Sequence, residues 1–393
     1  MAREVVQDPI PFPESFRETG DAAAQSQAAV LLTLGNLLRF EDPFAMELMA
    51  EEQPPPEPEE ILPEEDRQRL NIPAGIYDLA RVRGVRFDAN FIRERVAGRE
   101  AVVSGMAIEE AGTSLSLLPA LAERLHAEPS QPLAAAELLQ ASLSHPDELV
   151  RVAAASSYAE VALPQQQAIP IRILAEGTRS EDETTRDVAA TALARLVPGH
   201  PRLRELVRPE PYSVEGEPTH TSTMIHGTWA RNQPWWKPGG DFHTYIRSNV
   251  DPNLYSAGDF YSWSGDWSDA GRADGALRLI QWVNDHQLDG LDLFAHSHGG
   301  NVAMLANKTS LRIGRLVMMA CPVHRRKYFP EFTRVNKVVA IVTHMDLVIL
   351  ADGGGQRFND ARIQEIILPL WFTGHSKTHD PEIWRRHDLP ARI

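Results

Sequence analysis

The sequence contains little cysteine and, for its size, little positive charge. Among 393 residues Cys321 is the single cysteine, which excludes an intramolecular disulfide and a multi-thiolate metal site and is typical of a cytoplasmic protein. The 39 Lys and Arg residues are outnumbered by 54 Asp and Glu, which gives a formal net charge of −15 at pH 7. Without a clustered basic face for phosphates, nucleic acid is not expected as a ligand.

Long apolar runs are missing as well. The first twenty residues lack the basic start, apolar centre and small-residue cleavage site of a secretory signal. The most apolar early segment, residues 28–38, is too short to span a bilayer and includes Gly35 and Asn36. We therefore expect no transmembrane segment, a cytoplasmic location, and packing of residues 28–38 against another part of the chain.

Composition divides the chain into several segments. Its length exceeds that at which one hydrophobic core usually stops growing, so two or more folded units are expected. Residues 51–66 read EEQPPPEPEEILPEED, with eight acidic residues, five prolines and no basic residue. Proline removes backbone donors and the like charges repel, so this segment is predicted to be an extended linker. It separates a helical or irregular segment, residues 1–50, from a helical region of unassigned role, residues 67–112.

Residues 113–211 are rich in alanine and leucine and show no strand-like alternation. Two segments within them match at an offset of 35 residues: Glu148–Val161 (ELVRVAAASSYAEV) and Glu183–Leu196 (ETTRDVAATALARL). Each follows an aspartate and carries an arginine at its fourth position: Asp147 with Arg151, and Asp182 with Arg186. Helical units repeated at this spacing bury their apolar faces by stacking on one another. The segments resemble HEAT-type repeats, which implies a surface for a protein partner; an ordinary helical bundle is the alternative.

After Pro209 the composition shifts to aromatic, glycine and histidine residues, and we place a domain boundary near residue 212. Short apolar runs then alternate with helical patterns such as Gly271–Asp285 and Gly299–Asn307. The runs predicted as strands are Ser222–His226, Asp259–Ser264, Leu291–His296, Arg315–Ala320, Val338–Thr343 and Ile366–Phe372. Such alternation predicts a mostly parallel sheet covered on both faces. The predicted fold is therefore multidomain: an all-α, HEAT-like repeat region and then an α/β domain at 212–393.

Residues 291–306, LDLFAHSHGGNVAMLA, predict an apolar strand, a tight turn at Ser297 and a helix that opens on glycines. Such a turn exposes a serine hydroxyl as a nucleophile and needs small residues two positions to either side. Gly299 satisfies this need on one side, and Ala295 stands in place of glycine on the other. Taken alone, a serine at a helix start is also a common helix cap.

A serine becomes an effective nucleophile when a histidine accepts its proton and a carboxylate holds that histidine in one tautomer. The second strand after Ser297 runs into Asp346, and the third is followed by His375. We expect these three residues to form a catalytic triad, with His379 as the alternate base. Two other aspartates are candidates for the acid: Asp352 and Asp360.

Acyl transfer also needs donors for the oxyanion that forms when the nucleophile attacks. The segment MIHGTWA ends an apolar strand at His226 and Gly227, which would place a flexible oxyanion loop beside the turn at the nucleophile. The backbone amides of Thr228 and of His298, the residue after Ser297, are the candidate donors.

Together these pieces resemble a lipase-like or esterase-like α/β-hydrolase over residues 215–393. The motifs that carry the resemblance are HGTWA, WSGDWSDAGR, AHSHGG, THMD and GHS. It implies cleavage of an ester, thioester or amide through an acyl-enzyme, with no cofactor and no metal. Little chain precedes the first strand of this region, so a reduced sheet is expected. Three tryptophans either border a substrate pocket or fill the core: Trp229, Trp235 and Trp236.

The sequence thus predicts a serine hydrolase that cleaves a carboxylic ester, with a small molecule or a lipid as its substrate. Peptidase or acyltransferase chemistry uses the same triad, so the sequence does not separate these reactions. A different interpretation is a non-catalytic, hydrolase-like binding module on a HEAT-type scaffold, because more than half of the chain precedes residue 212.

Overall fold

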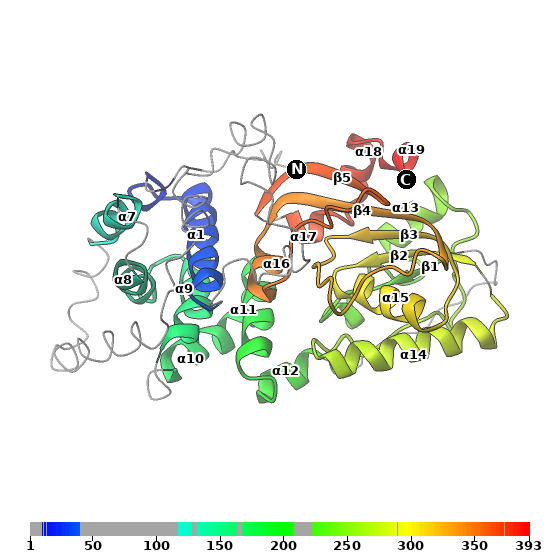
Figure 1. The fold of residues 1–393 in the computed structure, drawn as a ribbon, viewed down its shortest axis with the longest axis horizontal. Helices are drawn as coiled ribbons and strands as arrows, with labels where there is room; N and C mark the ends of the chain where they lie inside the picture. Colours follow the sequence, from blue (N-terminus) through cyan, green and yellow to red (C-terminus); the bar gives the residue numbers. More distant parts are fainter. Residues whose placement is uncertain are drawn as a thin grey trace. The chain divides into compact units, whose positions relative to one another are not determined.

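The computed structural model describes residues 10, 12, 14–39, 117–127, 132–162, 167–207, 222–288, 290–372 and 374–393. The chain divides into two compact units, a helical unit that extends to residue 197 and includes 350–353, and an α/β unit formed by the rest. Both are drawn in Figure 1, and each is described by itself. The predicted linker at 51–66, the region at 67–112 and the boundary near 212 lie outside the described residues.

The helical unit is built from one 3-10 turn and six helices in its described part: η1 (Glu14–Phe16), α1 (Asp21–Arg39), α7 (Leu118–Ala127), α8 (Pro132–Ser142), α9 (Glu148–Val161), α10 (Ala168–Gly177) and α11 (Glu183–Leu196). Helix α9 packs against α1, α8, α10 and α11. The α1–α9 approach is close: a Cβ on Gly35 would meet Ser157 Cα at 2.7 Å. The apolar segment 28–38 therefore packs on another helix, as expected. No described helix is long and apolar enough to cross a membrane.

The two matched segments of this unit form α9 and α11, and their helix starts are alike. The side chain of Asp147 accepts from Val150 N at 3.2 Å, and Asp182 accepts from Thr185 N at 2.7 Å. Nη1 of Arg151 donates to His145 O and that of Arg186 to Ser180 O, both at 2.8 Å. These bonds satisfy backbone groups that a helix end and its preceding turn leave open. The sequence match is therefore also a match of local structure.

The α/β unit contains a five-stranded, all-parallel sheet, with strands β1 (Ser222–Ile225), β2 (Leu291–His296), β3 (Ile313–Met319), β4 (Val335–Asp346) and β5 (Ile363–Phe372). The strands lie in sequential order from β1 to β5. Because parallel crossovers are right-handed, strands added in one direction place on one face the helices that lead directly into the next strand. All five strands were predicted from their apolar runs.

The sixth predicted strand, 259–264, is wrong. This segment is irregular, and Ser222 of β1 instead forms an isolated parallel bridge with Leu254. The apolar residues of the segment are aromatics that pack: Tyr261 Oη donates to Gly275 O at 2.8 Å, and Trp263 Nε1 donates to His226 O at 2.8 Å. Burial for packing produced the apolar pattern that we interpreted as a strand.

The two faces of the sheet are covered by different helices (Figure 1). Helices α14 (Asp269–Asp285) and α15 (His298–Thr309) cover the face that includes Leu293 and Leu316. Helices α13 (Asp241–Asn249), α18 (Pro381–Arg386) and α19 (Leu389–Arg392) cover the face that includes Phe294 and Val317. Since successive strand residues point to opposite faces, strands buried on both sides are apolar throughout. The remaining elements are α12 (Pro201–Leu206), η5 (Ala230–Asn232), α16 (Leu347–Asp352) and α17 (Gly374–Lys377).

Candidate active site

Ser297 occupies the turn between β2 and α15. Its backbone has φ 52° and ψ −134°, a conformation that costs about 1–3 kcal/mol for a residue with a side chain and that persists only when the surroundings hold it. Its amide donates to Met319 O at 2.8 Å, and its carbonyl accepts from Gly300 N at 2.9 Å. The turn is therefore fixed at its start by β3 and at its end by the first turn of α15.

Small residues around Ser297 are required by close backbone approach. A Cβ on Gly299 would lie 2.6 Å from His226 O and 2.7 Å from Ile225 O, and backbone atoms cannot yield to it. A Cβ on Gly227 would lie 2.8 Å from Ser297 Cβ. On the other side Ala295 is fully buried in the core, so alanine is accommodated where glycine was expected.

Asp346 and His375 form a buried hydrogen-bonded pair. Asp346 ends β4, where it is in register with Phe372 of β5, and His375 lies in α17 just beyond β5. His375 Nδ1 is 2.7 Å from Asp346 Oδ2. A carboxylate accepts, so Nδ1 carries the proton and Nε2 is left as the basic nitrogen.

The Asp346 carboxylate and backbone are both held in place. Its Oδ1 accepts from Val348 N at 2.9 Å and from Ile349 N at 3.2 Å, so the side chain also opens α16. The side chain of Gln356 spans its backbone, accepting from Asp346 N at 3.0 Å and donating to Asp346 O at 3.2 Å. Backbone amides stabilise the ionised form of a carboxylate. Sequence reasoning missed Gln356, which no motif marks.

His379, the alternate base, has other surroundings. Its ring stacks on Trp235 with centroids 3.8 Å apart and planes 6° apart. Desolvation, together with the nearby His375, lowers the pKa of His379 to about 3. Of the two histidines, His375 is the one that contacts Asp346. Among the other candidates for the acid, Asp360 binds Arg362 through both carboxylate oxygens, at 2.9 and 2.8 Å.

The loop after β1 lies against the turn at Ser297. His226 is completely buried, and this burial lowers its pKa to about 3. The centroid of its ring lies 4.4 Å from the ring centroid of Trp236. Trp229 has a left-handed φ of 63°, and its amide donates to Gly265 O at 3.1 Å. Two side-chain atoms of this loop are buried without a hydrogen-bond partner: Thr228 Oγ1 and Trp229 Nε1.

The tryptophans of this loop differ in burial. Trp235 is 8% exposed and Trp236 1%, and both belong to the core on the α13 face of the sheet. Trp236 Nε1 donates to Ala230 O at 2.8 Å. These two rings therefore fill the core, which was one of the two expectations. Trp229 keeps an intermediate exposure.

His298, next to Ser297, belongs to a buried polar network that sequence reasoning missed. Its Nδ1 lies 2.9 Å from Asn301 Nδ2 and 3.2 Å from Arg272 Nη1. Both partners are donors, so Nδ1 carries a lone pair and Nε2 carries the proton. Arg272 is itself held by Asp269 at 2.6 Å and by Tyr328 Oη at 3.0 Å.

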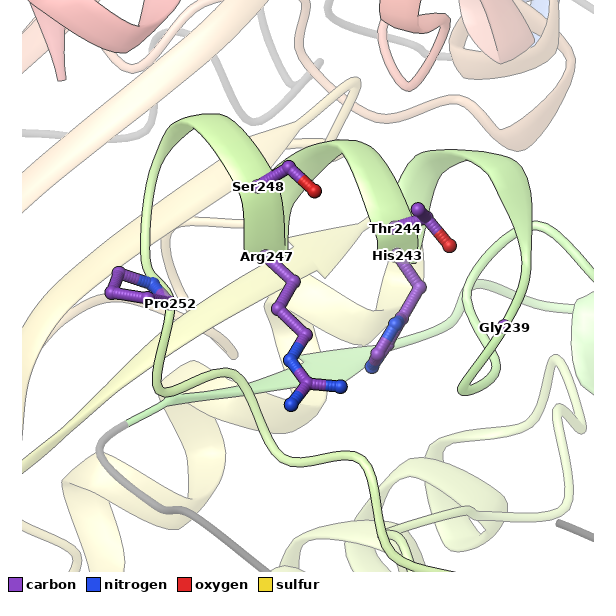
Figure 2. Close-up of a pocket in the computed structure, with 6 residues that line it drawn as sticks. All are labelled: Gly239, His243, Thr244, Arg247, Ser248 and Pro252. Atoms are coloured by element: carbon purple, nitrogen blue, oxygen red, sulfur yellow. The ribbon is translucent and has the colours of Figure 1, made fainter. Parts of the chain in front are cut away.

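A pocket of ≈ 500 Å³ lies elsewhere in the α/β unit, lined by Gly239, His243, Thr244, Arg247, Ser248 and Pro252. Figure 2 shows the side chains of His243 and Arg247 pointing the same way from α13. His243 Nε2 is bonded to Tyr255 O at 2.8 Å. None of the predicted site residues lines this pocket.

Within the described ranges no group of three or more His, Cys, Asp or Glu residues is arranged to hold a metal ion. The structure brings Asp346 and His375 together and places the turn at Ser297 against the loop at Gly227. No protein-family model matches the sequence, and no curated protein matches it either.

Proposed function

We propose that the α/β unit is a serine hydrolase of the lipase-like or esterase-like α/β-hydrolase type, which cleaves a carboxylic ester. Ser297 is the nucleophile, His375 the general base and Asp346 the residue that orients the base. The observation that carries the proposal is the buried pair of Asp346, the last residue of β4, and His375, just after β5, whose side chains are 2.7 Å apart. This pair lies beside the strained turn at Ser297, which follows β2. In parallel sheets ligands bind at the carboxyl ends of strands, where all three residues lie.

The proposed reaction has two halves. Ser297 Oγ attacks the ester carbonyl carbon while His375 Nε2 takes the hydroxyl proton, and the carbonyl oxygen becomes an oxyanion. The amides of Thr228 and His298 donate to that oxyanion; one such donor contributes about 10²–10³-fold to the rate. The intermediate collapses as His375 returns the proton to the leaving alcohol. Water, deprotonated by His375, then attacks the acyl-enzyme, and His375 returns that proton to Ser297 Oγ as the acid leaves.

Asp346 holds His375 in one tautomer through this cycle in our proposal. Its Oδ1 already accepts two amides and its Oδ2 accepts from His375 Nδ1. The carboxylate is the acceptor in all three bonds, which fix its position. The aspartate therefore stabilises the imidazolium that forms when His375 holds two protons.

A second candidate function, a HEAT-type scaffold that binds a protein partner, is favoured by the helical unit. The equal starts of α9 and α11, at an offset of 35 residues, support a repeated unit, and α9, α10 and α11 pack on one another in sequence. A stacked array of this kind offers an extended binding surface. In that interpretation the α/β unit would be a non-catalytic module.

Ester hydrolysis by the whole chain tests the two candidates. 4-Nitrophenyl esters of increasing acyl length are offered to the wild type, to Ser297→Ala and to Ser310→Ala, a matched change at an exposed serine at the other end of α15. We expect Ser297→Ala to lose about 10⁴-fold or more in kcat and Ser310→Ala to equal the wild type. Absence of turnover of every ester by the wild type would favour the scaffold. Transfer of the acyl group to an added alcohol or amine would indicate an acyltransferase instead.

A further inference from the structure

We infer that His296, the residue before the nucleophile, is a positioning residue that holds the backbone of His375 through its own ring. This inference rests on the proposed function and gives a role to His296, whose side chain has none in the motif AHSHGG. His296 Nε2 lies 3.2 Å from His375 O, and the side chain is 5% exposed. One residue thus joins the turn of the nucleophile to the segment of the base.

The protonation of His296 follows from its partner. A backbone carbonyl only accepts, so Nε2 of His296 must carry a proton and donate it to His375 O. Burial, reinforced by the neighbouring His379 and His375, holds the pKa of His296 well below its usual value. The ring is therefore neutral at pH 7, and Nδ1 keeps a lone pair.

The lone pair on Nδ1 argues against a role in packing alone. Nδ1 is buried and has no hydrogen-bond partner, and a Cβ on Gly227 would lie 3.1 Å from it. A buried acceptor without a donor destabilises the folded chain. An apolar side chain would fill this space without that loss. The feature that distinguishes histidine here is the donor at Nε2.

The segment of His375 needs an external support. Helix α17 has four residues, too few to be stable without tertiary contacts. The carbonyl of His375 accepts a second bond from Thr378 Oγ1 at 2.8 Å, but Thr378 belongs to the same segment. The bond from His296 instead comes from the end of β2.

The rings around His296 leave it little freedom. Its ring centroid lies 4.8 Å from that of His375, 4.7 Å from that of His379 and 5.4 Å from that of Trp235, all edge-to-face. Movement of the ring would displace His375 and His379 in the segment of the base and Trp235 in the loop after β1. The position of the His375 imidazole relative to Ser297 is therefore set through His296.

Two nearly isosteric substitutions separate the donor from the packing. His296→Gln keeps an N–H at a similar reach, whereas His296→Met has the same length and no donor. We expect His296→Gln to keep kcat within about threefold of the wild type and His296→Met to lose about 10- to 100-fold, with KM within about twofold in both. A misplacement of about 1 Å in a catalytic group costs about that much. Circular dichroism establishes that each variant is folded.

The outcomes separate this inference from the proposed function. Equal kcat for the Gln and Met variants, or wild-type kcat for His296→Met, would overturn the positioning role while leaving the triad intact. A Met variant that does not fold beside a folded Gln variant of low kcat would overturn it too, because the donor would then serve stability alone. If the wild type turns over no ester in a Ser297-dependent way, the proposed function fails and this role fails with it.

Discussion

Replacing Asp346 by asparagine is expected to abolish most of the activity while leaving the fold intact. The asparagine oxygen would take the place of Oδ1, because that position accepts the amides of Val348 and Ile349. The amide nitrogen then takes the place of Oδ2, 2.7 Å from His375 Nδ1. An NH₂ group donates, so His375 must turn Nδ1 into an acceptor and carry its proton on Nε2. The nitrogen that should take the serine proton is then already protonated.

The size of this effect follows from the loss of the productive tautomer. A change of tautomer at this bond lowers kcat by about 10⁴-fold, which corresponds to about 5.4 kcal/mol at about 1.36 kcal/mol per decade. The stability cost should be small, because α16 keeps its capping acceptor and the new amide still bonds to the ring. Activity and stability are therefore expected to change independently.

The assay is steady-state hydrolysis of the best 4-nitrophenyl ester by Asp346→Asn, with Asp360→Asn as the matched control. Asp360 is an aspartate paired with Arg362, and its loss is expected to leave kcat unchanged. Circular dichroism and urea unfolding check that both variants fold. A kcat for Asp346→Asn within about tenfold of the wild type would refute the assignment of this residue as the orienting carboxylate.

Three further predictions concern the free energy of unfolding of the α/β unit. It can be measured by tryptophan fluorescence during urea unfolding, because all eight tryptophans lie in this unit, from residue 229 to residue 384. Gly299→Ala should lower the free energy of unfolding by about 1–3 kcal/mol, because the added Cβ meets backbone oxygens. Gly199→Ala is the control and should change that free energy little, because there is open space around Gly199. Equal effects of the two substitutions would contradict this prediction. His226 and His379 have pKa values of about 3 in the folded chain, against 6.5 in the unfolded chain. Between these pH values each histidine takes up a proton when the chain unfolds, so the free energy of unfolding should fall as the pH drops below 6.5. The expected slope is up to about 1.4 kcal/mol per pH unit for each histidine. A free energy of unfolding that stays constant from pH 6.5 to 5 would contradict this prediction. So would a pH dependence in His379→Gln as steep as that of the wild type. Gln356→Leu should lower the free energy of unfolding by about 1–3 kcal/mol, because Asp346 N and Asp346 O lose the hydrogen bonds that the Gln356 side chain makes to them. The same substitution should lower kcat. An unchanged kcat would show that Gln356 does not position Asp346.

The sequence allowed prediction of the sheet because its signals are local. Runs such as 291–296 and 315–320 are apolar on both faces, which a strand within a parallel sheet requires. The turn at Ser297 was predicted for a similar reason, since close backbone approach demands glycine at 299. The false strand at 259–264 shows the limit of such patterns, because buried aromatics in an irregular segment produce the same apolar run.

The contacts that hold the candidate site are non-local, and this is why the sequence did not indicate them. His296 and His375 are 79 positions apart, and Arg272 and His298 are 26 apart. Gln356 lies in no motif, and the motif AHSHGG, which contains His296, gives that side chain no role. Both roles follow from which carbonyl or amide each side chain faces once the chain is folded. Which of His375 and His379 contacts Asp346 could not be read from the sequence either, because the two lie only four positions apart and the contact forms between separate strands' ends.

The most direct test of the central claim is covalent labelling of the whole chain by a fluorophosphonate, with the modified peptide identified by mass spectrometry. We predict one phosphonylated residue, Ser297, no labelling in Ser297→Ala, and labelling in His375→Ala that is slower by about 10³-fold or more. Labelling that persists in Ser297→Ala, or a wild type that stays unmodified under conditions in which a known serine esterase reacts completely, would contradict the account.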